Sequence, residues 1–177
     1  INRVLSEGDF KAKANATMTL MGTEGGKAML IGLGKTDKAD AHAYREAGAT
    51  VVASCKKVHG NDLTVLFHDA DLACMTSFAE GMMLRDYAYD LYKKKDDEED
   101  DTKLSARINC NEGDATALSA AIDRAASIVS GVHLSRDLGN CPPNDMYPMA
   151  FAEKAELWAK QYDNVKVEII DLSLIHI

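Results

Sequence analysis

The sequence predicts an α/β fold in which helices flank a mixed sheet, and three observations lead to this prediction. Short apolar runs alternate with longer segments whose apolar residues recur every three or four positions, as in strands followed by helices. The 177 residues, of which 46% are hydrophobic and 27% charged, suffice for one core of ordinary size and a small appendage. No internal repeat indicates a solenoid or a propeller.

The first expected element is a β-hairpin, and a helix follows it. Residues 16–21 and 27–33 are short apolar runs, and the glycine-rich segment between them supplies the backbone freedom of a tight turn. The helix is expected because its apolar residues form a single stripe at helical spacing. This stripe consists of Tyr44, Ala47, Val51, Cys55 and Val58.

Polar residues and a glycine mark both ends of this helix. Asp37, with Asp40 three positions later, resembles a capping box at the start. Lys56 and Lys57 complement the helix dipole at the last turn, and Gly60 lies where a left-handed cap is expected. These signals place the helix between Asp37 and Gly60.

The alternation of strand and helix then continues. Residues 62–67 form a candidate buried strand, and Asp71 is placed to cap a second helix that runs to about Tyr92. The stripe of this helix includes Met75, Ala79 and Met82. Residues 93–102 are a charge run expected in an exposed loop, because burial cannot offset the cost of ordering them. A third strand is expected at residues 104–110.

A long helix and a shorter one complete the predicted fold. The long helix runs from Asp114 to about Leu134 without an interior proline and reaches roughly 30 Å. Its apolar stripe consists of Leu118, Ala121, Ile122, Ala125, Ile128, Val129 and Val132. Two prolines then break the chain, and Pro148 suits the first position of the shorter helix. The buried stripe expected there consists of Phe151, Ala155, Trp158 and Tyr162. Residues 165–170 are expected to form a strand.

Charge and composition argue against several classes of protein. The formal net charge of −8 opposes binding to nucleic acid, and no apolar run approaches the roughly 18 residues of a membrane-spanning helix. The cysteines lack the spacing of a zinc site or of a disulfide framework and are expected as reduced thiols. They are Cys55, Cys74, Cys110 and Cys141. No secretory signal segment opens the sequence, so the expected location is cytoplasmic.

His68, Asp69 and Asp71 are the first candidates for a metal site. Imidazole and carboxylates bind metals, and strand ends in α/β folds often carry functional sites. Three such residues in a single loop rarely surround one ion, however, and a carboxylate after a strand commonly caps the next helix. The sequence therefore favours a structural role for this loop.

A glycine-containing turn is a candidate for anion binding. Gly32, Gly34, Lys35 and Thr36 precede a helix whose first amides can attract phosphate. The segment matches neither a Walker loop nor a dinucleotide-binding fingerprint. The favoured interpretation is a strand exit at which glycine avoids backbone crowding, with phosphate binding as the alternative.

No catalytic constellation is predicted. No serine lies in the G-x-S-x-G turn of a hydrolase. Cys55 and Cys74 fall on helix stripes and are expected in the core, whereas Cys141 lies in a loop without an identifiable base. The other histidines are expected on helices or helix ends, as solvated or satisfied imidazoles: His42, His59 and His133. The sequence assigns no catalytic and no metal-binding residue.

Three segments carry a family resemblance. They are MLIGLGKTD at residues 29–37, EGMMLRDYAYDLYKKK at residues 80–95 and RDLGNCPPNDMYPMAFAEKAELWAK at residues 136–160. In this order they resemble the N-terminal part of the leucyl aminopeptidase family, and the third resembles that family's Arg-Asp-Leu-x-Asn-x-Pro-Pro-Asn start of the catalytic domain. The likeness covers most of residues 16–171. Tyr147 before Pro148 is a mild departure from the family's pattern.

The resemblance implies how the chain is organised. A macro-domain-like N-terminal α/β domain is expected at residues 1–112, a linker helix at 113–136 and the truncated start of the peptidase domain at 137–171. The first domain is expected to make oligomer contacts and to cover the active-site region. Residues 172–177, LSLIHI, fit no continuation of the family and are expected to be a non-native tail.

The resemblance also implies an activity for the parent protein. Members of the family are cytosolic homo-hexamers that remove N-terminal residues, leucine among them, from peptides with two divalent ions such as zinc or manganese. The ions activate a bridging water and polarise the scissile carbonyl. The family's metal ligands, its NTDAEGR motif and its catalytic Lys and Arg lie downstream of residue 177. No residue here inherits these roles, and the fragment alone is expected to be inactive.

Two other functions stay open on the sequence. A free-standing macro-like module would bind ADP-ribose or a related nucleotide, with residues 32–36 near the phosphates. An assembly scaffold would form a defined oligomer without any small-molecule ligand.

Overall fold

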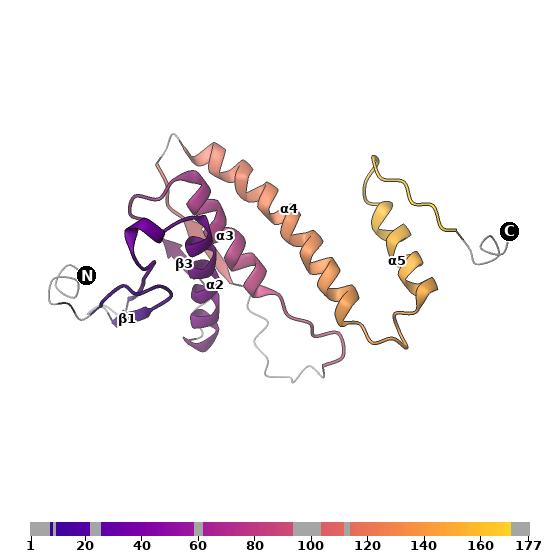
Figure 1. The fold of residues 1–177 in the computed structure, drawn as a ribbon, viewed down its shortest axis with the longest axis horizontal. Helices are drawn as coiled ribbons and strands as arrows, with labels where there is room; N and C mark the ends of the chain where they lie inside the picture. Colours follow the sequence, from indigo (N-terminus) through magenta and orange to yellow (C-terminus); the bar gives the residue numbers. More distant parts are fainter. Residues whose placement is uncertain are drawn as a thin grey trace. The chain divides into compact units, whose positions relative to one another are not determined.

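The structure is a computed structural model with a mixed α/β fold, as the sequence predicts (Figure 1). It describes residues 8, 10–21, 26–58, 62–93, 104–111 and 114–170. Most of the charge run and the C-terminal tail therefore lie outside the described residues. The chain divides into unit 1, Ile1–His133, and unit 2, Leu134–Ile177, and the division falls inside the long helix α4 (Ala115–Asn140).

The predicted hairpin at the start of unit 1 is confirmed. β1 (Thr17–Met21) and β2 (Lys27–Ile31) pair antiparallel. The ladder continues beyond the strands, since the Gly32 amide donates a hydrogen bond to the Ala16 carbonyl at 2.8 Å. Residues 22–25 of the connection lie outside the described residues.

Helix α2 (Ala41–Val58) starts later than the predicted capping box implies. A short 3-10 turn, η1 (Thr36–Lys38), contains Asp37, and the cap is Asp40, whose Oδ1 accepts a hydrogen bond from the Ala43 amide at 3.0 Å. The capping box that begins at Asp37 is therefore wrong, because the tight turn separates that residue from the helix. Other predictions at the end of this helix fall outside the described side chains: Lys56, Lys57, Val58, His59 and Gly60.

β3 (Asp62–Val65) and β4 (Ser105–Ile108) pair in parallel and form a second sheet. Helix α3 (Leu72–Asp86) lies between them in sequence, as a parallel pair requires a long crossover. Among the described strands, the expected mixed sheet is thus present as two sheets of two strands each. The predicted end of α3 at Tyr92 is wrong, because Tyr87 adopts an extended backbone with ψ 129°.

Helix α4 has 26 residues and a length of about 39 Å. It runs past its predicted end at Leu134 to Asn140, because the first proline after Leu134 is Pro142, which lies beyond that point. The buried members of its predicted stripe are Leu118, Ala125 and Val129. Ile128, also predicted to be buried, is 55% exposed. Of the described helices, none has the length and apolar character needed to cross a membrane.

Unit 2 contains helix α5 (Pro148–Ala159), which begins with proline as predicted. The predicted buried stripe is wrong, since Phe151 is 52% and Trp158 38% exposed while Ala159 is buried. Residues 165–170 form no strand. The described part of unit 2 offers no second strand to pair with them, and an isolated strand is not stable in water. Unit 2 by itself therefore leaves apolar side chains exposed.

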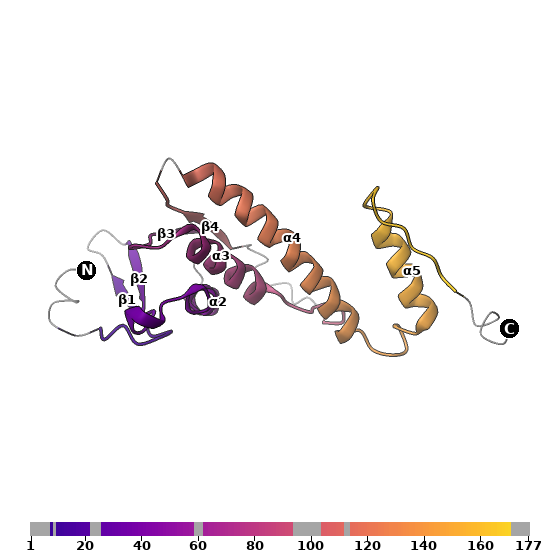
Figure 2. The ribbon, with the colours of Figure 1, turned by 45° about the horizontal axis from the view of Figure 1, so that its top comes forward.

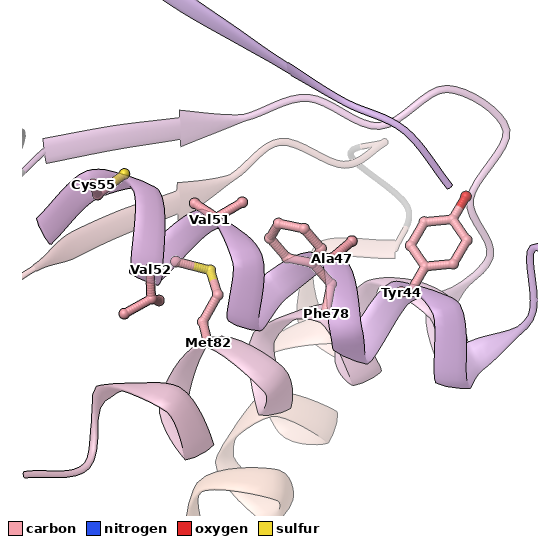
Figure 3. Packing of buried hydrophobic residues seen from close by; sticks show 7 residues of the cluster. All are labelled: Tyr44, Ala47, Val51, Val52, Cys55, Phe78 and Met82. Atoms are coloured by element: carbon pink, nitrogen blue, oxygen red, sulfur yellow. The ribbon is translucent and has the colours of Figure 1, made fainter. Parts of the chain in front are cut away.

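The core of unit 1 lies between α2 and α3 and against the strands (Figure 3). The predicted stripe of α2 is buried at each described position: Tyr44, Ala47, Val51 and Cys55. Figure 3 shows Phe78 and Met82 reaching from α3 toward α2, where Val52 is fully buried. Strand residues from both sheets pack on the same cluster: Met29, Ile31, Leu63 and Val65. This packing fixes the two sheets against one pair of helices.

Candidate functional site

A pocket of about 420 Å³ lies between α3, β4 and the first turns of α4. Its volume is within the range of small-molecule sites. Most of the lining is apolar: Met82, Met83, Leu104, Ile108, Leu118 and Ile122. Asp86, Cys110 and Ser119 supply the main polar side chains, and the described lining residues include no histidine, lysine or arginine. The pocket can shelter an apolar group, but the part of its lining that the structure describes holds no serine–histidine or cysteine–histidine pair.

The loop before α3 has the structural role that the sequence favours. Asp71 Oδ1 accepts a hydrogen bond from the Cys74 amide at 2.8 Å, so this carboxylate caps the helix. His68 and Asp69 are almost fully exposed, with 3.6 Å between His68 Nε2 and Asp69 Oδ2. Asp69 has a positive φ of 54°, which turns the chain between the strand and the helix. The three side chains therefore do not converge on one point.

Titration shifts in this region follow from the cap and from burial. The hydrogen bond from the Cys74 amide lowers the pKa of Asp71, because it stabilises the carboxylate. Burial, followed by the hydrogen bond and charge of Asp71, raises the pKa of Cys74 to about 11. Burial raises the pKa of Cys55 as well. Both thiols are protonated at neutral pH and are therefore poor nucleophiles.

The glycine turn is explained by close backbone contacts. The Gly32 and Gly34 amides donate hydrogen bonds to the carbonyls of Ala16 and Ala12 at 2.8 and 3.0 Å. A Cβ on Gly32 would collide with the Lys13 carbonyl, and Gly34 has a φ of +84°. Neither amide is directed at solvent to meet an anion. Lys35 and Thr36 are exposed beside the turn.

The described residues hold no group of three or more His, Cys, Asp or Glu side chains arranged to bind a metal ion. The two divalent ions that the family resemblance implies therefore do not fit the described part of this chain. His42 lies on the surface of α2, with Nε2 3.6 Å from Glu46 Oε1, and His133 packs its ring on Tyr87 at 5.1 Å. Cys110 and Cys141 are both half-buried.

Sequence reasoning missed the pocket. Its lining comes from α3, β4 and α4, and the charge run separates α3 from the other two in sequence, so no local pattern marks the pocket. Reasoning from periodicity did find several of its walls, because Met82, Leu118 and Ile122 belong to predicted helix stripes. Periodicity does not predict the cavity that remains where these apolar stripes meet.

Comparison with known proteins decides the family. Residues 1–96 match the family model described as the cytosol aminopeptidase family, N-terminal domain. The chain belongs to the cytosol aminopeptidase family. The matched residues include β1, β2, α2, β3 and α3. They therefore contain the buried core cluster of unit 1.

Curated relatives in the cytosol aminopeptidase family extend the likeness beyond this domain. A probable cytosol aminopeptidase of Agrobacterium fabrum is 38% identical over 182 residues, which cover 96% of this chain and 35% of that protein. One from Rhizobium etli is 35% identical over 90% of this chain and 33% of its own length. The cytosol aminopeptidase of Pseudomonas aeruginosa is 29% identical over 97% of this chain and 36% of its own. The chain thus spans about a third of the length of these relatives.

Solved structures share the fold. A tomato leucine aminopeptidase mutant superimposes with a TM-score of 0.80 at 24% identity, covering 98% of this chain and 35% of that one. The bottromycin maturation enzyme BotP in complex with Mn gives a TM-score of 0.71 at 23% identity, over 90% of this chain and 33% of its own. The likeness shows a fold similar to the N-terminal region of a leucine aminopeptidase. Neither these matches nor the glycine turn supports the ADP-ribose module.

Proposed function

We propose that this chain is the N-terminal part of a metal-dependent aminopeptidase that removes N-terminal residues, leucine among them, from peptides. The observation that carries the proposal is the family match over residues 1–96. The named relatives support it, since they are cytosol aminopeptidases and align with 90% or more of this chain. Their names also support a cytoplasmic location.

In this proposal the chain contributes structure and no catalytic group. Residues 1–112 form a macro-domain-like module for contacts in a homo-hexamer and for covering the active-site region. The alternation from β2 through α2, β3 and α3 to β4 supports the macro-like arrangement. Residues 113–136 serve as the linker helix, and 137–171 begin the peptidase domain.

Unit 2 supports the assignment of residues 137–171. Its exposed apolar side chains need further protein to cover them: Tyr147, Met149, Phe151, Leu157, Trp158, Ile169 and Ile170. Exposed apolar surface of this extent is uncommon on a complete domain. A longer peptidase domain would supply both that cover and a strand to pair with residues 165–170.

The metals belong to the remainder of the parent protein. The proposal assigns it two divalent ions, zinc or manganese, and the solved complex of BotP with Mn supports manganese. When bound, such ions activate a water molecule and polarise the scissile carbonyl. The described residues of this chain provide no cluster for them, so in this proposal the ions are held by residues outside this chain.

The test is hydrolysis of leucyl-p-nitroanilide by the 177-residue chain with added zinc or manganese. The expected result is no release of p-nitroaniline above the metal-only control. Release that depends on both the chain and the metal would show that the chain contains a catalytic site, and would overturn its assignment as a non-catalytic part.

A further inference from the structure

The buried face of helix α4 ends part-way along its length. The structure describes all of its residues, and the buried ones are Leu118, Ala125 and Val129. The helix nevertheless continues to Asn140, and Figure 2 shows it unbroken over this length. The division between unit 1 and unit 2 falls between His133 and Leu134, within one turn of the point at which burial ends. Only the part of α4 up to Val129 is therefore held by fully buried side chains.

The sequence of α4 changes character at the same place. Residues 115–126, ATALSAAIDRAA, are rich in alanine, the strongest helix former. Residues 127–133, SIVSGVH, contain none of the residue types that favour helices most, which are Ala, Leu, Arg, Met, Lys, Gln and Glu. Ile128, Val129 and Val132 are β-branched and lose side-chain freedom in a helix. Local preference thus supports the helix least where its burial ends.

Gly131 lies in this segment without a packing reason for glycine. A Cβ built on it would meet nothing within 4 Å. Glycine inside a helix is less favourable than alanine, because it loses more backbone freedom on folding. Ser130 precedes it, and pairs of glycine and serine are among the recognised sites at which helices kink. Gly131 therefore weakens the helix without allowing any closer contact.

The ring contact that follows Gly131 is a weak anchor for the helix. His133 packs on Tyr87 with 5.1 Å between the ring centroids. Its Nε2 atom is buried, and the described residues offer it no hydrogen-bond partner, which costs free energy. One turn before Gly131, the Ser127 hydroxyl donates a hydrogen bond to the Asp123 carbonyl at 3.0 Å, an arrangement that often bends helices. Contacts on both sides of the glycine thus favour a local opening.

We propose that α4 has a hinge at Ser130 and Gly131. Opening the hinge breaks the backbone hydrogen bonds that cross this turn, in which the amides of residues 132–134 donate to carbonyls four residues earlier. The chain beyond Gly131 then changes direction while the core of unit 1 stays folded. The hinge does not depend on the peptidase assignment, because it rests on the sequence and the packing of α4.

Amide hydrogen exchange of the 177-residue chain, resolved by residue with NMR, tests the hinge. A hinge gives a minimum of protection at residues 132–134, with slower exchange on both sides, at residues 122–128 and 137–139. Fraying from the end of the helix gives a different profile, in which exchange quickens steadily from Val129 to Asn140. A steady profile of this kind would overturn the proposal.

Gly131→Ala is the decisive variant, because alanine favours the helix and its methyl group has room. It should slow the exchange of the amides of residues 132–134 about fivefold, the factor that corresponds to the difference between glycine and alanine inside a helix. Gly139→Ala is the matched control, since a Cβ on this second glycine of α4 also meets nothing within 4 Å. It should leave the exchange of residues 132–134 unchanged. Unchanged exchange in Gly131→Ala, or equal slowing by both substitutions, would also overturn the hinge.

Discussion

Gly48 of α2 and Gly81 of α3 each lie directly against the backbone of the opposite helix. A Cβ added to Gly48 would overlap the Phe78 carbonyl, and one added to Gly81 would overlap the Arg45 carbonyl. Each glycine thus makes room for the backbone of the opposite helix. The core of unit 1 can close around Val52 and Phe78 because these two positions have no side chain.

Gly48→Ala and Gly81→Ala should each destabilise the chain by roughly 1–3 kcal/mol, because the methyl group forces the packed helices apart. Urea denaturation followed by circular dichroism measures the change. Gly131→Ala is the matched control, since nothing lies within 4 Å of a Cβ on this α4 glycine. It should be neutral or stabilising by up to about 1 kcal/mol. Equal effects at all three positions would contradict the close crossing.

Arg45 and Glu80 form an ion pair beside that crossing. Arg45 Nε and Nη2 lie 3.0 and 2.8 Å from Glu80 Oε2, and the side chains are 40% and 22% exposed. Glu80→Gln should lower the free energy of unfolding by about 1 kcal/mol, because it leaves the guanidinium with a weaker partner. The comparison is Asp62→Asn, which breaks the more exposed pair with Arg107. If Asp62→Asn lowers the free energy of unfolding as much as Glu80→Gln does, partial burial does not strengthen the Arg45–Glu80 pair.

Asp71 should make the stability of the fold depend on pH in the acidic range. Its pKa is lowered in the folded chain by the Cys74 amide, so the carboxylate stabilises the fold above its unfolded pKa, near 3.8. This contribution is lost as the pH falls through the lower, folded pKa. Urea titrations at pH 6 and below should show that the free energy of unfolding falls more steeply with decreasing pH for the unsubstituted chain than for Asp71→Asn. Parallel curves for the two proteins would mean that the cap carries no charge-dependent stability.

Cys74 should react slowly with a thiol-specific disulfide reagent. Its pKa of about 11 leaves little thiolate at pH 8, and the reaction should quicken in denaturant. The same shift stabilises the fold while the thiol is protonated, and this contribution is lost as the pH rises from 9 toward 11. Asp71→Asn should speed labelling of Cys74, because the carboxylate raises that pKa, and should leave Cys55 slow. Peptide mapping of the labelled chain distinguishes the two. Fast labelling of Cys74 in the folded, unsubstituted 177-residue chain would contradict the raised pKa of this thiol.

Local sequence signals predicted the elements whose partners are inside unit 1. The glycine-rich connection predicted the hairpin, and the spacing of Tyr44, Ala47 and Val51 predicted the buried face of α2. Asp71 was predicted as a cap because the cap is a local interaction. These predictions needed no knowledge of distant residues.

Predictions that depend on distant partners were wrong or missed. The pattern at residues 165–170 is apolar and strand-like, but a strand needs a neighbour, and the described part of unit 2 has none. Ile128 fits the helical stripe of α4 yet is exposed, because no described element packs on that side. The pocket is invisible in the sequence for the same reason, since three elements brought together by folding define it.

The most direct test of the account compares leucyl-p-nitroanilide hydrolysis by the longer protein that contains this chain with hydrolysis by the chain alone, both with added manganese. The account predicts metal-dependent turnover by the longer protein and none by the 177-residue chain. Turnover by the chain alone, or a longer protein that is inactive with manganese and with zinc, would contradict it.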